Sequence, residues 1–203
     1  MKKIIVLVCL AASVSLSIGT AMADSIKGRV GVTGKIGLLV PSTSDFNDKA
    51  VRPDVGFVGG GGLLFGIDDN FAAEIDVTRT EFGSDFPRSG NAGDFGVTDI
   101  SLGAQYRFQV THKQLVPYIG AGFDLLLNDY SDQNGRVHDV DTTVGVHISG
   151  GVDYFFLKQV ALMTEVKALA ALDTDIKDSS GVTRGNFDPT NISGVVGLRF
   201  FFN

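Results

Sequence analysis

The chain has 203 residues, a length that suits one domain, and a formal net charge of −6. The acidic balance and the lack of a basic patch argue against a nucleic-acid partner. Its single cysteine is Cys9, so residues 24–203 cannot form a disulfide scaffold.

Residues 1–23 have the pattern of a secretory signal peptide. Lys2 and Lys3 supply the positive start, residues 4–16 the apolar region, and Ala-Met-Ala at 21–23 the small-residue cleavage site. The segment is too short and too rich in small residues to be a transmembrane helix. We therefore expect an exported protein whose leader is removed.

Eight later segments alternate between apolar and polar or glycine residues, as half-buried β-strands do. In the first segment, apolar residues occupy even positions from Ile26 to Val40, and Lys27, Arg29 and Lys35 occupy odd positions. The predicted strands are residues 26–40, 55–67, 71–80, 95–108, 115–127, 142–156, 160–172 and 192–202.

The connections between these strands alternate in length. Long connections cover residues 41–54, 81–94, 128–141 and 173–191, and short ones cover 68–70, 109–114 and 157–159. Long loops at one end and short turns at the other are typical of an outer-membrane barrel, and several strands exceed the ~9–11 residues that cross a bilayer. We predict an all-β fold, an eight-stranded antiparallel up-and-down transmembrane β-barrel over residues 24–203, with both termini in the periplasm.

A soluble periplasmic barrel or sandwich is the alternative, and there the apolar faces would form the core. Aromatic residues near the short connections favour the membrane barrel, because aromatic girdles mark membrane interfaces. These residues are Phe65, Phe71, Tyr106, Phe108, Tyr118, Tyr154, Phe155, Phe156, Phe200, Phe201 and Phe202. In the first strand we accordingly expect lipid contacts from Ile26, Val30, Val32, Ile36 and Leu38.

The polar faces carry six cations and six anions. Such a balance suits a narrow lumen, where unpaired charges of one sign repel and are poorly hydrated. An eight-stranded barrel is just wide enough to be filled by side chains, so we expect no wide aqueous pore. The predicted lumen charge network consists of Lys27, Arg29, Lys35, Glu74, Asp76, Asp99, Arg107, Asp124, Asp153, Glu165, Lys167 and Arg199.

Three segments of the C-terminal half resemble the OmpW family of small outer-membrane barrels. VPYIGAGFDLLLND at 116–129 is similar to that family's fifth strand, and GGVDYFFLKQVALMTEVKALAALDTDIKD at 150–178 to its sixth turn and seventh strand. Asp188-Pro189, followed by a strand ending GLRFFF, is similar to its last segment. The chain differs from the family in having no tryptophan and in ending on Asn203 after the final aromatic residue.

The resemblance implies a passive path for small hydrophobic compounds across the outer membrane of a Gram-negative bacterium. In that model the solute enters from the loop side and leaves sideways between strands into the lipid. The implied partners are outer-membrane lipid, a small hydrophobic solute and the barrel-assembly machinery, for which Phe202 is the expected signal; no cofactor is implied. Leu64, Leu126 and Phe155 are apolar residues on polar faces, and we consider them for pocket lining or local lumen packing.

Two other functions stay open at this point. Long loops rich in Asp and Ser are equally compatible with a surface-adhesion barrel. His147 and Ser149 lie two apart on one strand face, as in lipid-modifying outer-membrane enzymes, with Asp153 and Glu165 as carboxylates that could lie nearby. The Gly-Gly pair at 150–151 does not look like the motif of outer-membrane lipid A deacylases, so we expect packed lumen residues and no enzyme.

One loop imitates a calcium-binding loop, with Asp132, Asn134, Gly135 and Asp141 at ligand-like positions. Tyr130 stands where the first carboxylate is needed, and the final Glu is missing. We therefore expect an acidic solvated loop and no metal site.

Overall fold

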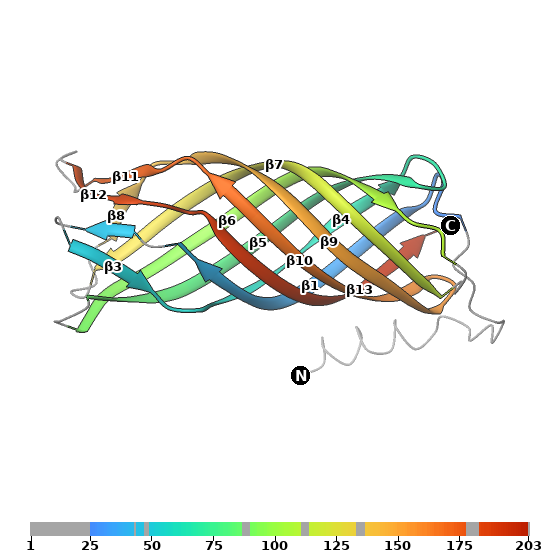
Figure 1. Cartoon of the computed structure of the whole chain (residues 1–203), viewed down its shortest axis with the longest axis horizontal. Coiled ribbons are helices and arrows are strands. Elements are labelled where there is room, and N and C mark those ends of the chain that lie inside the picture. Colours follow the sequence, from blue (N-terminus) through green and yellow to red (C-terminus); the bar gives the residue numbers. More distant parts are fainter. Residues whose placement is uncertain are drawn as a thin grey trace, which may run out of the picture.

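The computed structural model describes residues 25–42, 44–46, 49–86, 90–110, 114–132, 137–177 and 183–202, which form a closed antiparallel β-barrel (Figure 1). The predicted leader lies outside the described residues. The prediction of eight barrel strands is confirmed, and β1 closes the barrel by pairing with both β4 and β13. The barrel strands are β1 (Val30–Pro41), β4 (Gly56–Gly66), β5 (Phe71–Phe86), β6 (Gly90–Arg107), β7 (Leu115–Asp132), β9 (Thr143–Leu157), β10 (Val160–Ala171) and β13 (Asn191–Phe202).

The long connections, which the sequence predicts to be loops, contain five short strands within the described residues. β3 pairs with β5, β8 pairs with β7, and the others complete a second ring between them. The sequence conceals these strands because each is only three to five residues long, too short for the alternation to be recognised. They gather at what we name the long-loop end; the opposite end is the short-turn end (Figure 1). They are β2 (Ser44–Phe46), β3 (Lys49–Pro53), β8 (Val137–Val140), β11 (Thr174–Lys177) and β12 (Thr183–Phe187).

Side chains on the barrel wall are apolar outside and mostly polar or small inside, as an outer-membrane barrel requires. Ile36, Phe123 and Ile148 expose 56, 73 and 68% of their surface, whereas Lys35 and Asp124 are buried. The predicted inversion of apolar and polar faces is therefore confirmed for the barrel strands. In the described part of the chain, no helix has the length and apolarity to cross a membrane.

The first strand begins at Val30 and not at Ile26, which changes the place of two side chains. Gly28 has a φ of +73°, and the N–H of Arg29 donates to the carbonyl of Ile26 over 2.9 Å, so the chain turns here. The turn breaks the alternation of the strand. Ile26 is consequently buried inside the barrel and Lys27 is exposed, so the predictions for these two residues are wrong. The other first-strand residues face outward as predicted: Val30, Val32, Ile36 and Leu38.

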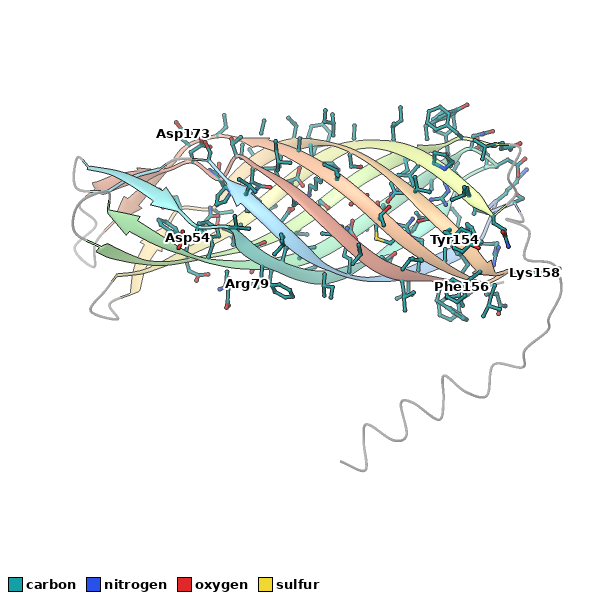
Figure 2. All side chains as sticks on the ribbon, turned by 60° about the horizontal axis from the view of Figure 1, so that its bottom comes forward. Asp54, Arg79, Tyr154, Phe156, Lys158 and Asp173 are labelled. Atoms are coloured by element: carbon teal, nitrogen blue, oxygen red, sulfur yellow. The ribbon has the colours of Figure 1, made fainter. Side chains whose placement is uncertain are left out.

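The aromatic girdle is smaller than predicted. Figure 2 shows Tyr154 and Phe156 near the short-turn end, and both are exposed. Phe155 lies between them in the strand, so alternation directs it inward, and the same holds for Phe201; Tyr118 also faces inward. These three residues are buried and do not belong to the girdle. The exposed members are Phe65, Phe71, Tyr106, Phe108, Tyr154, Phe156 and Phe202, and Phe200 is partly buried.

A hydrophobic cluster fills the barrel interior at the short-turn end. The rings of Phe155 and Phe201 stack with their centroids 5.5 Å apart. Ile26 and Leu64 pack against them together with two alanines, and each residue is at most 5% exposed. This cluster closes the lower end of the lumen.

Candidate functional site

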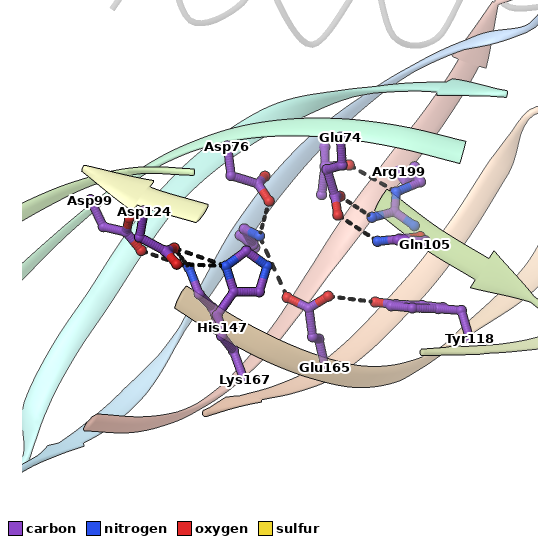
Figure 3. A network of polar contacts seen from close by, with 12 residues as sticks. Glu74, Asp76, Asp99, Gln105, Tyr118, Asp124, His147, Glu165, Lys167 and Arg199 are labelled. Atoms are coloured by element: carbon purple, nitrogen blue, oxygen red, sulfur yellow. Dashed lines mark hydrogen bonds and ion pairs between the residues drawn. The ribbon is translucent and has the colours of Figure 1, made fainter. Parts of the chain in front are cut away.

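A network of charged side chains fills the middle of the barrel interior, as Figure 3 shows. Its lower part is built around Asp153 of β9, whose Oδ2 accepts hydrogen bonds from Arg107 over 2.5 Å and from Arg199 over 2.8 Å. None of the three residues exposes more than 1% of its surface. Because burying a charge is costly unless it is paired, two arginines on one aspartate require a second anion.

Glu74 of β5 is that second anion. Its Oε1 accepts from Nη2 of Arg199 over 2.7 Å, and the amide of Gln105 donates to its Oε2. The ring of Tyr118 lies within 5.5 and 5.7 Å of the two guanidinium groups, and its hydroxyl donates to Glu165 over 3.1 Å. The lower part of the network is therefore neutral and closely paired.

Lys35 of β1 starts the upper part of the network. Its Nζ lies 2.8 Å from Asp76 on β5 and 3.6 Å from Glu165 on β10. The Lys35–Asp76 pair spans β4, where Gly62 stands opposite Asp76 and a Cβ would collide with its carboxylate. Glycine on the inner face of β4 thus leaves the room that this ion pair needs.

Lys167 of β10 holds the other side of the upper part. Its Nζ lies 2.7 Å from Asp99 and 2.6 Å from Asp124. Nδ1 of His147 lies 2.9 and 2.8 Å from the two carboxylate oxygens of Asp124. A Cβ at Gly122 would lie 2.7 Å from the imidazole, so this glycine makes room for His147.

Ten of the twelve predicted charged residues meet in this network, and two do not. Lys27 lies exposed on a turn, and Arg29 lies at the short-turn end, where it donates to the carbonyl of Lys158 over 3.3 Å and approaches the Phe201 ring. Among the described residues, the ion pairs and hydrogen bonds given above join four cations and six anions. The surplus negative charge lies in the upper part, beside His147.

Above the network, an apolar chamber faces the long-loop end of the barrel. It holds a cavity of about 40 Å³ whose floor includes Lys35, Asp76, Asp99, Glu165 and Lys167. In its wall, the ring of Phe82 stacks on that of Phe95 with the centroids 5.6 Å apart. The apolar residues that line the cavity are Leu39, Pro41, Val58, Phe82, Val97, Leu126, Pro189 and Val195.

The three residues that we considered for pocket lining lie in two different parts of the barrel interior. Leu126 lines the chamber, whereas Leu64 and Phe155 belong to the hydrophobic cluster at the short-turn end. Phe82 was missed because the predicted third strand ends at Thr80. Continuing the alternation by two positions would have placed Phe82 on the inner face beside Thr80, where the structure has it.

His147 and Ser149 do not form a catalytic pair in the described structure. His147 contacts Asp124, and within the described residues it shares no hydrogen bond with Ser149. The two stand opposite Gly122 and Gly120 of β7, so they fit the packed lumen that the sequence favoured.

The calcium-like loop lies partly outside the described residues, because positions 133–136 are not described. Among the residues that are described, no group of three or more His, Cys, Asp or Glu side chains could hold a metal ion.

Comparison with known proteins agrees with this architecture. OprG from Pseudomonas aeruginosa aligns with a TM-score of 0.71 and 17% identity over 87% of this chain and 97% of its own. AlkL aligns with a TM-score of 0.60 and 14% identity over 93 and 97%, and OmpW of E. coli with 0.51 and 17% over 87 and 98%. No curated protein matches the chain significantly.

At these identities the solved structures show a shared fold. The family model described as "Outer membrane protein beta-barrel domain" matches residues 7–200. The match covers all eight barrel strands apart from the last two residues of β13. The chain belongs to the outer membrane protein β-barrel family.

Proposed function

We propose that this barrel is a passive path for small hydrophobic molecules across the outer membrane. The order of layers inside the barrel supports the proposal: an apolar chamber, the charged network beneath it, and the hydrophobic cluster at the short-turn end. An apolar solute gains about 25 cal/mol for each Å² of apolar surface that it buries in the chamber. Passage through the network would separate buried ion pairs, so the solute leaves sideways into the lipid.

In this proposal the long-loop end faces the exterior and the short-turn end faces the periplasm. Val30 and Phe202 are register partners, so the barrel begins and ends at the short-turn end. Phe202 is half exposed there, in a position where the assembly machinery can read it. Outer-membrane lipid covers the apolar outer wall.

Filling the chamber tests the proposal. Leu126 is 1% exposed and faces the chamber, whereas Leu127 is 40% exposed and faces outward. Leu126→Trp should abolish the uptake of radiolabelled naphthalene by cells that depend on this protein, and Leu127→Trp should leave it intact. Equal uptake by both variants, or no uptake by the unaltered protein above cells that lack it, would refute the proposal.

Surface adhesion is the second candidate, because the ring that contains β2, β3, β8, β11 and β12 extends the barrel at the long-loop end. Shortening residues 178–182 should spare naphthalene uptake if the barrel is a transporter. Loss of cell attachment after this deletion, in a barrel that takes up no more naphthalene than cells lacking the protein, would favour adhesion.

A further inference from the structure

The upper part of the charged network carries more negative than positive charge. Its lysines, Lys35 and Lys167, each contact two carboxylates. The four carboxylates are those of Asp76, Asp99, Asp124 and Glu165. His147 adds at most one positive charge, so among the described residues at least one negative charge stays uncompensated. A buried charge is costly unless it is paired, so this level of the barrel favours the binding of a further cation.

Two of these carboxylates have an oxygen that accepts no hydrogen bond from the described residues. Asp99 binds Lys167 through Oδ2, and Asp76 contacts Lys35 through Oδ2. The Oδ1 atom of each aspartate is buried and has no partner, and Asp76 as a whole is only 8% exposed. Because nearly all buried polar atoms in proteins are hydrogen-bonded, both oxygens indicate a place for a donor.

The two aspartates are neighbours on the floor of the chamber. Thr78 is the register partner of Asp99, so Asp76 and Asp99 are diagonal neighbours on the inner faces of β5 and β6. Diagonal neighbours lie about 7–8 Å apart, so one donor group between them can contact both carboxylates. All three residues line the cavity of about 40 Å³, which exceeds the ~10–15 Å³ that a single water molecule needs.

A primary ammonium group has the chemistry that this floor lacks. It carries a positive charge and three N–H donors, and it has no acceptor. A hydroxyl group donates once and brings no charge, and a carboxylate would add to the negative surplus. Above the floor, the apolar walls that include Phe82 and Leu126 suit a hydrophobic body.

We infer that the chamber binds small apolar amines, with the ammonium group between Asp76 and Asp99 and the apolar body against the walls above. The inference rests on the proposed function in taking the chamber as the place where solutes bind, and it names their chemical class. An alkylamine is protonated at neutral pH, as a lysine side chain is. It therefore supplies both the missing charge and the missing donors.

Naphthalene derivatives that differ at the head group test the site. The probes are 1-naphthylmethylamine, its trimethylammonium analogue, 1-naphthylmethanol and 1-naphthoate. Equilibrium dialysis against the purified barrel in phospholipid nanodiscs measures their binding, and empty nanodiscs correct for partition into lipid. The primary amine should bind at least about tenfold more tightly than the alcohol, and 1-naphthoate should bind most weakly. The trimethylammonium analogue has the charge without N–H donors, so it should bind less tightly than the primary amine.

Equal affinities of the primary amine and the alcohol would overturn the inference. Equal affinities of the two cations would overturn the role of the unpartnered carboxylate oxygens.

A substitution on the floor tests the assigned residues. Asp99→Asn should weaken binding of the primary amine at least about tenfold and leave binding of the alcohol unchanged, which also shows that the chamber is intact. Asp129→Asn is the matched control and should change neither, because Asp129 pairs with Arg79 on the outer wall. If Asp99→Asn abolishes binding of the alcohol as well, Asp76→Asn makes the same test from β5. Loss of amine affinity in the control, or its retention in both floor variants, would overturn the site.

The outcomes separate this inference from the proposed function. Naphthalene uptake by a barrel that does not prefer the amine overturns the amine site and leaves transport standing. Preference for the amine in a barrel that takes up no naphthalene overturns transport and leaves the site.

Discussion

Arg199 of β13 and Asp153 of β9 form an ion pair 2.8 Å long, and neither residue exposes any surface. They are 46 residues apart in sequence, and β10 lies between their strands. Asp153 also binds Arg107 of β6, so one carboxylate connects three strands of the wall. The barrel interior is therefore braced by charges and not by a hydrophobic core at this level.

Removing that carboxylate should be strongly destabilising. Asp153→Asn leaves two buried guanidinium groups with reduced pairing, and breaking a buried pair in this way costs about 3–5 kcal/mol. Asp129→Asn is the control, because Asp129 pairs with the partly exposed Arg79 (Figure 2), and such pairs contribute about 0–1 kcal/mol. Unfolding of the barrel by guanidinium in lipid vesicles measures the free energy of unfolding of both variants. Equal decreases for Asp153→Asn and Asp129→Asn would contradict the bracing role of Asp153.

Two adjacent glycines of β9 should respond in opposite ways to a methyl group. A Cβ at Gly151 would collide with the ring of Tyr118 and with the backbone carbonyl oxygen of Thr164, whereas the nearest atom to a Cβ at Gly150 is 3.9 Å away. Gly151→Ala should therefore cost about 1–3 kcal/mol through overpacking, and Gly150→Ala should be neutral or stabilising. The same unfolding experiment measures both variants, and an unchanged free energy of unfolding for Gly151→Ala would mean that the Tyr118 ring and the Thr164 carbonyl can both shift to admit the methyl group.

The position of Ile26 gives a third test. Ile26 is 5% exposed in the cluster at the short-turn end, so Ile26→Ala should cost about 2–5 kcal/mol. Lys27→Ala, one residue later on the exposed turn, should change the free energy of unfolding by less than about 0.5 kcal/mol. A large effect of Lys27→Ala on the free energy of unfolding would contradict the exposed position of this side chain and indicate that it lies in the lumen.

The turn between β4 and β5 should depend on pH. Backbone N–H groups of Asn70 and Phe71 donate to Asp68 over 2.8 and 2.7 Å and hold the pKa of its carboxyl below the usual range. The resulting stabilisation is present above the ordinary pKa of an aspartate and is lost as the pH falls through the lowered value. The difference in unfolding midpoint between the unaltered protein and Asp68→Asn should therefore shrink on acidification from pH 6 to about pH 2; a constant difference would contradict it.

Much of the fold can be predicted from the sequence because the strand alternation is local. Ile36 and Lys35 are neighbours whose opposite directions follow from a period of two, whatever the rest of the chain does. The eight barrel strands and the outward apolar face follow from the same pattern, and the long and short connections follow from turn chemistry. The alternation failed at Ile26 because the left-handed conformation of Gly28 inserts a turn, which the residue type permits but does not require.

The tertiary structure alone decided which residues meet across the barrel. Asp153 forms ion pairs with Arg199 and Arg107, and Lys35 forms one with Asp76 across Gly62. These partners meet because closure of the barrel fixes the register of strands that are distant in sequence. A single strand carries its own alternation, but partners across a lumen are set by the whole ring.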